Sequence, residues 1–208
     1  MQHDALGFAA GILSEFLAHA PSPQAWEALK KEGLLREWFI HPLSQEGVAL
    51  WEEAHKSESQ ETVAVDYTQL FLCDEEFLKA PPYGAYYLDP NGETYTQESD
   101  AVLAFYNAYG FSSPLQKSEP ADHLAIELAF LSALFYSAKT QSAFEQGLKT
   151  FVADHLAPWV KGWTGHVKTH AKSAFYKGLA FMLEAYVKAV IKELNIDVKK
   201  RKLYRLVA

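Results

Sequence analysis

The sequence predicts an all-α protein, a compact helical bundle of about ten helices. Apolar residues recur at helical spacing in one segment after another, whereas the alternation typical of strands is almost absent. The 208 residues are 49% hydrophobic and include 13 Phe, 11 Tyr and 5 Trp. This composition indicates a globular chain with enough apolar side chains for a sizeable core.

The first 72 residues are expected to form five helices, separated by proline, glycine or polar residues. The second of them begins at Ser22-Pro23, because proline suits the first turn of a helix. The polar stretch 56–61 is expected to be a loop. The predicted helices cover residues 6–17, 22–33, 34–40, 44–54 and 61–72.

Residues 73–95 interrupt this periodicity. The stretch 80–92 contains three prolines and two glycines, and a residue that precedes proline avoids the helical region. Tyr83, Tyr86 and Tyr87 make this stretch aromatic, so we expect an ordered loop against the bundle. Long ordered loops in helical proteins are often functional, but a purely structural Ω-loop fits the composition equally well.

Helical periodicity returns after this loop. Gly110 is expected to cap the next helix at its C-terminal end, because glycine adopts the left-handed conformation without strain. Residues 111–117 are typical of a linker, and the basic tail 199–202 is expected to be solvated. The later predicted helices cover residues 95–109, 118–135, 143–155, 158–170 and 173–194.

The predicted central helix, residues 118–135, is apolar on nearly every side, which places it in the middle of the bundle. Ser118 or Glu119 can cap its start, and Pro120 suits its first turn.

The few polar residues of this segment form a cluster. Glu119, His123 and Glu127 are four residues apart and so share one helix face, with Asp122 beside them. Buried charges are costly unless they are paired. The cluster therefore either completes an internal network or binds a cationic ligand.

The net charge of −7 argues against nucleic acid and anionic membrane surfaces as partners. A single cysteine, Cys73, excludes an internal disulfide and fits a reducing compartment. No apolar run is long enough to span a bilayer, and no basic region precedes the first apolar segment as in a secretory signal. We therefore expect a cytoplasmic protein without membrane insertion.

Motifs for catalysis or cofactor binding are scarce. There is no glycine-rich phosphate loop and no Cys-x-x-Cys pair. His166 with His170, and His123 with Glu127, could each provide two metal ligands, but neither pair has an obvious third. We predict no catalytic residue, no metal and no cofactor. The alternative is a small-molecule- or metal-binding helical enzyme that uses Asp122, His123 and Glu127.

Three blocks follow one another along the chain: Tyr67-Thr-Gln-Leu-Phe-Leu, Ala80-Pro-Pro-Tyr-Gly-Ala-Tyr-Tyr-Leu-Asp and Glu119-Pro-Ala-Asp-His-Leu-Ala-Ile-Glu-Leu. In order and spacing they resemble the TorD/DmsD family of redox-enzyme maturation chaperones. The resemblance implies a TorD-like, all-helical, cytoplasmic chaperone and not an enzyme. It also implies binding of the twin-arginine signal peptide of a molybdenum-cofactor oxidoreductase of the DMSO- or TMAO-reductase type. Such binding delays export and assists cofactor insertion and folding.

The resemblance also implies which residues bind the signal peptide. By similarity, signal-peptide binding falls on Tyr67, Leu70, Phe71, Pro82, Tyr83, Gly92, Asp122 and His123. Arginine pairs best with carboxylates, and Glu119, Asp122 and Glu127 supply them. The apolar segment of the peptide needs a groove, to which Pro81 and Tyr86 also contribute.

The family pattern leaves two points open. DmsD-like members carry Trp where this chain has Tyr83, and the central block is closer to TorD, so the client reductase is not identified. Guanine nucleotide binding has been associated with the family, but no phosphate loop in this sequence supports it.

Residues 111–119 form a hinge between an N-terminal helical part, 1–110, and a C-terminal helical part, 120–208. Neither part can hide its apolar surface alone, so the two are expected to form one compact domain. A hinge of this kind permits two copies to exchange their C-terminal helices, and the resemblance favours such exchange. We expect mainly monomer with a minor domain-swapped dimer.

Overall fold

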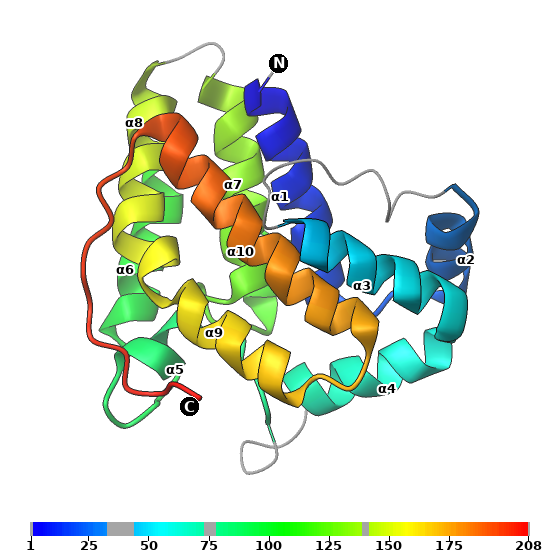
Figure 1. Ribbon diagram of the computed structural model, residues 1–208. Helices are drawn as coiled ribbons and strands as arrows, with labels where there is room; N and C mark the ends of the chain where they lie inside the picture. The colour runs from blue at the N-terminus through cyan, green and yellow to red at the C-terminus, as the bar shows by residue number, and fades with distance from the viewer. Residues whose placement is uncertain (1, 33–43, 73–77, 139–141, 208) are drawn as a thin grey trace.

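Helix α7 (Leu124–Ala138) lies between α1 (Gln2–Ala18) and α8 (Ser142–Phe151), as Figure 1 shows. The computed structural model describes residues 2–32, 44–72, 78–138 and 142–207. Most residues of α7 are buried, because its apolar side chains extend around the whole helix. Its place in the middle of the bundle agrees with the sequence prediction.

Helices α1 and α7 are joined by side-chain hydrogen bonds at two levels. The Ser14 hydroxyl donates to the Ala125 carbonyl oxygen at 2.7 Å, and the Ser132 hydroxyl donates to the Gly7 carbonyl oxygen at 2.8 Å. Helix α1, from the N-terminal half of the sequence, is thus attached at two points to α7, from the C-terminal half.

Helix α10 (Ala174–Leu194) crosses α3 (Ser44–Ser57) at a pair of glycines. A Cβ on Gly47 would lie 3.0 Å from the Gly178 carbonyl oxygen, and a Cβ on Gly178 would lie 3.0 Å from the Gly47 carbonyl oxygen. The same Cβ on Gly178 would lie 2.5 Å from the Trp51 ring. The two backbones therefore approach each other only because both residues lack a side chain.

The N-terminus of α10 is capped by groups from elsewhere in the chain. Ser173 is its N-cap, and its side chain accepts from the Tyr176 N–H at 3.2 Å. The Asp66 carboxylate accepts from the Ser173 N–H at 2.8 Å, and Glu58 accepts from the Ala174 N–H at 2.5 Å. Carboxylates are favourable here because helix N-termini carry partial positive charge.

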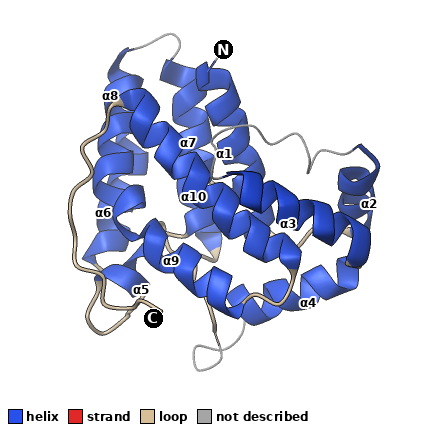
Figure 2. Cartoon of the chain, viewed as in Figure 1, coloured by secondary structure: helices blue, strands red, loops and turns tan. Residues whose placement is uncertain are grey.

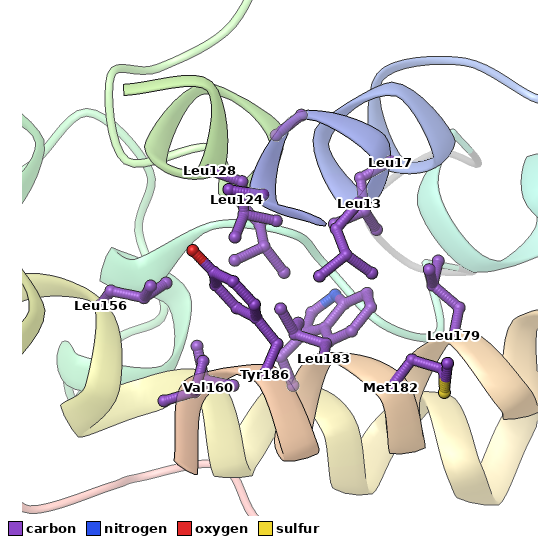
Figure 3. Packing of buried hydrophobic residues seen from close by; sticks show 14 of the residues in the cluster. Leu13, Leu17, Leu124, Leu128, Leu156, Val160, Leu179, Met182, Leu183 and Tyr186 are labelled. Atoms are coloured by element: carbon purple, nitrogen blue, oxygen red, sulfur yellow. The ribbon is translucent and has the colours of Figure 1, made fainter. Parts of the chain in front are cut away.

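A shared hydrophobic core joins α1 and α7 to α10 and α9 (Ala157–His170). Figure 3 shows leucines of α1 and α7 that point toward side chains of α10, with Leu156 and Val160 at one side of the cluster. The labelled residues come from both halves of the sequence: Leu13, Leu17, Leu124, Leu128, Leu156, Val160, Leu179, Met182, Leu183 and Tyr186.

The described residues form helices and loops, which confirms the all-α prediction (Figure 2). Their only β feature is an isolated bridge between Tyr83 and His123. The described part contains ten α-helices, and one of them, α5, lies in the stretch 80–92 that was expected to be a loop. The remaining elements are α2 (Pro23–Glu32), α4 (Gln60–Phe71), α5 (Gly84–Leu88), α6 (Gln97–Ala108), the 3-10 turn η2 (Pro114–Lys117) and the π-helical turn η3 (Val152–Leu156).

Several predicted boundaries need correction. The helix predicted at 34–40 lies outside the described residues. The loop predicted at 56–61 is shorter, because α3 continues to Ser57 and α4 begins at Gln60. The helix predicted at 143–155 changes to the wider π-helical turn after Phe151. Gly110 has φ +65°, in agreement with the predicted cap.

Candidate functional site

A pocket of about 500 Å³ opens where the end of α4, the stretch 78–95, the residues before α7 and the C-terminal tail meet. Most of its described lining is aromatic, aliphatic or neutral polar, and Glu119 and Arg205 are the two charged residues. The lining residues are Phe71, Leu72, Leu78, Pro81, Tyr83, Tyr86, Asn91, Gly92, Thr94, Tyr95, Ser118, Glu119, Pro120 and Arg205.

Main-chain hydrogen bonds hold the stretch that forms one wall of this pocket. The Leu124 N–H donates to the Pro82 carbonyl oxygen at 2.8 Å, and the Gly84 N–H donates to the Asp122 carbonyl oxygen at 3.1 Å. These bonds flank the bridge between Tyr83 and His123. Residues 82–84 are therefore ordered by residues 122–124, at and just before the start of α7, and the loop is not attached through side chains alone.

The Asp122 side chain completes this attachment. Its Oδ2 accepts from the Ala85 N–H at 2.6 Å, and its Oδ1 accepts from the Ser99 hydroxyl at 2.5 Å. Burial raises the pKa of the Asp122 carboxyl, and the bonds from Ser99 and Ala85 oppose that rise. The carboxyl is only 1% exposed, so it is directed at the protein and not at the pocket.

Glu119 is the carboxylate that reaches the pocket. It is partly exposed, and the Tyr83 hydroxyl donates to its Oε2 at 2.9 Å. Burial, followed by the nearby charge of Glu119, raises the pKa of Tyr83, so its hydroxyl stays protonated as a donor. One carboxylate oxygen is thus fixed by a phenol, while the pocket side of the group can accept further hydrogen bonds.

The prediction that Glu119, Asp122, His123 and Glu127 share one face of the central helix is wrong. Helix α7 begins at Leu124, and the first three of these residues precede it. Pro120 and the acidic residues resemble a helix start, but residues 122–124 bond instead with residues 82–85. The cluster is therefore divided between the rim of the pocket and the interior.

His123 and Glu127 are buried, and burial favours the neutral form of each side chain. Burial lowers the pKa of His123 to about 3, and its Nδ1 accepts from the Ala125 N–H at 3.1 Å. Burial raises the pKa of Glu127 well above its usual value, with a smaller contribution from the charge of Asp122. The nearby Trp159 indole N–H opposes that rise, but among the described residues neither oxygen of Glu127 has a partner at hydrogen-bonding distance. Neither residue offers a charge to a ligand in the pocket.

Six of the residues predicted for the peptide site line the pocket: Phe71, Pro81, Tyr83, Tyr86, Gly92 and Glu119. The other six lie behind its wall or deeper in the core: Tyr67, Leu70, Pro82, Asp122, His123 and Glu127. Tyr67 illustrates the difference, because its hydroxyl donates to the carbonyl oxygens of Leu17 at 3.1 Å and Ala18 at 2.7 Å. Burial raises its pKa to about 12. Tyr67 therefore attaches α4 to the end of α1.

The sequence prediction missed two notable lining residues, Tyr95 and Arg205. Tyr95 is 69% exposed and adopts a positive φ of 57°. The sequence prediction placed Tyr95 at the start of a helix that covers 95–109, so neither feature was expected. Arg205 follows a basic stretch that was expected to be solvated. That expectation is wrong for Arg201, which is partly buried and forms a two-bond ion pair with Glu98 at 2.5 Å for each bond. The pairing lowers the pKa of Glu98.

The histidine pair predicted on α9 lies away from any complete ligand set. The rings of His166 and His170 are 5.9 Å apart between centroids, and His166 Nδ1 is 3.0 Å from the Lys79 carbonyl oxygen. In the described part of the chain, no three His, Cys, Asp or Glu residues are grouped as metal ligands. Within the same ranges, no helix has both the length and the apolarity needed to cross a bilayer.

Comparison with known proteins identifies relatives. Residues 41–164 match the family model described as nitrate reductase delta subunit. The chaperone protein YcdY of Escherichia coli is 30% identical over 170 residues, which cover 81% of this chain and 83% of that protein. The Tat proofreading chaperone DmsD of Salmonella typhimurium is 24% identical over 206 residues, or 99% and 98% of the two chains. The chaperone protein TorD of Aliivibrio fischeri is 26% identical over 143 residues, 66% of each chain.

A solved structure shares the fold. A candidate redox enzyme maturation protein from Archaeoglobus fulgidus superimposes with a TM-score of 0.52 and 22% identity, over 88% of this chain and 93% of that one. The family match covers more than half of the sequence, and YcdY, DmsD and TorD are all named as chaperones. The chain therefore belongs to the nitrate reductase delta subunit family, as a chaperone of the TorD/DmsD type and not an enzyme.

Proposed function

We propose that this protein is a cytoplasmic chaperone that binds the twin-arginine signal peptide of a molybdenum-cofactor oxidoreductase. Binding would delay export of the client while its cofactor is inserted and the client folds. The observation that carries this proposal is the pocket in which the Glu119 carboxylate stands among aromatic and proline side chains.

The chemistry of the pocket suits both parts of such a peptide. Glu119 is the only carboxylate among the described lining residues, and a guanidinium group forms its strongest hydrogen bonds with carboxylates. The apolar segment that follows the arginines can lie against Phe71, Leu72 and Pro81. Peptides recognised in this way gain specificity from the charged contact and affinity from apolar burial.

The alternative, a small-molecule- or metal-binding enzyme at Asp122, His123 and Glu127, has little support. All three side chains are buried, and Asp122 and His123 already accept hydrogen bonds from main-chain N–H groups. A catalytic acid or base needs access to a substrate proton, and these side chains do not have it.

Calorimetric titration with a synthetic twin-arginine peptide tests the proposal. We expect Glu119→Gln to weaken binding by at least about tenfold, because a charge-assisted hydrogen bond is worth about 1.5–3 kcal/mol. Glu93→Gln is the matched control, since it removes the same charge from an exposed position that does not line the pocket. A peptide with two lysines in place of the arginines should also bind less tightly.

Two results would contradict the proposal. One is equal affinity of the wild type and Glu119→Gln for the twin-arginine peptide. The other is equal affinity of the wild type for the arginine and lysine peptides.

A further inference from the structure

The C-terminal tail, residues 196–207, returns from the end of α10 past α8 and α6 to α5 (Figure 1). It is attached at intervals along this path. The Lys199 N–H donates to the Ala153 carbonyl oxygen at 3.1 Å, Arg201 pairs with Glu98, and the Tyr204 N–H donates to the Tyr87 carbonyl oxygen at 3.0 Å. The tail is thus ordered against the rest of the folded protein.

Near its end the tail carries Arg205, whose guanidinium group is bound by main-chain carbonyl oxygens. Nη1 of Arg205 donates to the carbonyl oxygens of Tyr86 and Asp89, each at 2.8 Å, and Nη2 donates to that of Pro90 at 3.3 Å. Its guanidinium carbon lies 4.8 Å from the centroid of the Tyr86 ring, within the range of a cation–π contact. A Cβ on Gly92, where φ is +75°, would collide with that carbon, so the absence of a side chain at Gly92 leaves room for Arg205.

The place that Arg205 occupies belongs to the pocket proposed for the peptide. Arg205 and Glu119 both line that pocket, and so do Tyr86 and Gly92. The order of residues in the tail also matches the chemistry of the proposed ligand. Basic residues at 199–202 are followed by Leu203, Tyr204, Arg205, Leu206 and Val207, so guanidinium groups and apolar side chains are combined in one extended segment.

We propose that the tail is an intramolecular competitor: Arg205 fills a guanidinium subsite that one arginine of the signal peptide takes when the tail is displaced. This inference rests on the proposed function. The subsite consists of the carbonyl oxygens of Tyr86, Asp89 and Pro90 and the face of the Tyr86 ring. Glu119 receives the other arginine of the peptide.

An internal competitor lowers the observed affinity by the fraction of molecules whose pocket is free. Coupling of this kind typically amounts to a factor of about 5–150. Removal of the Arg205 guanidinium should therefore tighten peptide binding, although it takes away a group that lines the pocket. An arginine that only built the wall of the site would have the opposite effect on removal.

Arg205→Gln in the full chain tests this inference by calorimetry with the twin-arginine peptide. We expect binding about 5- to 10-fold tighter than wild type. Lys200→Gln is the control, because Lys200 is an exposed residue of the same tail and its removal changes the net charge equally. The control should change affinity by less than about twofold, since exposed charges at a distance are screened by salt.

Hydrogen exchange measured by mass spectrometry follows the tail directly. In the wild type, peptide should speed exchange of residues 199–207, including the Tyr204 amide, because the tail is released. Arg205→Gln should speed the same exchange without peptide.

If the wild type binds peptide while Arg205→Gln binds equally or more weakly, or the tail stays protected in the complex, the competitor is excluded and the proposed function stands. If neither the wild type nor Arg205→Gln binds the peptide, the proposed function fails and the competitor fails with it.

Discussion

The Asp122 carboxylate and the Ala85 N–H form a 2.6 Å hydrogen bond across 37 residues of sequence. This bond joins the segment before α7 to the first turn of α5, and in the sequence Ala85 lies between two aromatic residues of the pocket wall, Tyr83 and Tyr86. Asp122 therefore positions the wall, although its own side chain is buried.

Replacement of Asp122 should affect stability as well as binding. Asp122→Ala leaves the Ala85 N–H and the Ser99 hydroxyl without their buried acceptor, so we expect a loss of about 2–4 kcal/mol in the free energy of unfolding. Asp122→Asn should cost about 1 kcal/mol, because the amide can accept from Ala85 and donate to Ser99. Urea denaturation followed by peptide titration measures both effects. Wild-type stability of Asp122→Ala combined with lost peptide binding would show instead that Asp122 contacts the peptide.

Salt should act mainly on association. From 0.1 M to 1 M salt the Debye length falls from about 10 Å to about 3 Å, which removes long-range attraction between the cationic peptide and the acidic protein. The association rate should fall about tenfold, and the dissociation rate should change much less. Stopped-flow fluorescence with a labelled peptide measures both rates. Equal rates at both salt concentrations would mean that the pocket recognises the apolar segment alone.

The buried carboxyl of Glu127 should make stability depend on pH. Burial raises its folded-state pKa well above 4.5, so between these values the folded protein retains a proton that the unfolded chain has lost. Stability from this group is therefore present below pH 4.5 and is lost as the pH rises, by at most about 1.4 kcal/mol per pH unit. The Glu127→Gln variant has no titratable group at this position, so it lacks this dependence of stability on pH.

The free energy of unfolding of Glu127→Gln, minus that of wild type, should thus increase from pH 5 to pH 8. Urea denaturation at the two pH values measures this difference. The titration of His123 affects both proteins equally and therefore cancels in the difference. Glu61→Gln, on the exposed side of α4, serves as the control. A difference that is the same at both pH values would mean that Glu127 is ionised in the folded state.

The predicted hinge at 111–119 leads to a prediction about the oligomeric state. Residues 111–115 line a pocket of about 490 Å³ together with Ser14, Glu15 and Ala18 of α1 and the following His19, so the hinge lies where the two halves of the sequence meet. Removal of about three hinge residues should prevent the C-terminal helices from folding back and should enrich a domain-swapped dimer. Light scattering after size-exclusion chromatography would detect it. A shortened chain that remains a stable monomer would place the hinge elsewhere.

The helices were largely predictable from the sequence because their signals are local. The apolar period of α10 is visible in its residues, and so is the glycine that follows α6. The start of α7 was predicted wrongly, because Pro120 and its acidic neighbours resemble an N-terminus, whereas hydrogen bonds to residues 82–85 determine their conformation.

The candidate site was predictable only in part for the same reason. The aromatic loop and Glu119 are visible as a motif, and the structure brings them to one pocket. The positions of Arg201 and Arg205 depend on acceptors more than 100 residues earlier, Glu98 and the carbonyl oxygens of residues 86–90. No local sequence pattern indicates such a pairing, so the basic tail 199–202 was expected to be solvated.

The glycine pair Gly47 and Gly178 affects how genetic variants of this protein should be interpreted. Every substitution of glycine adds a Cβ, and at either position that atom would meet the opposite main chain at 3.0 Å. Neither residue lines the pocket. A screen for lost chaperone activity would nevertheless score both positions among the most sensitive, because the amount of folded protein falls. Sensitivity to mutation is therefore an unreliable guide to the ligand site unless abundance is measured alongside it.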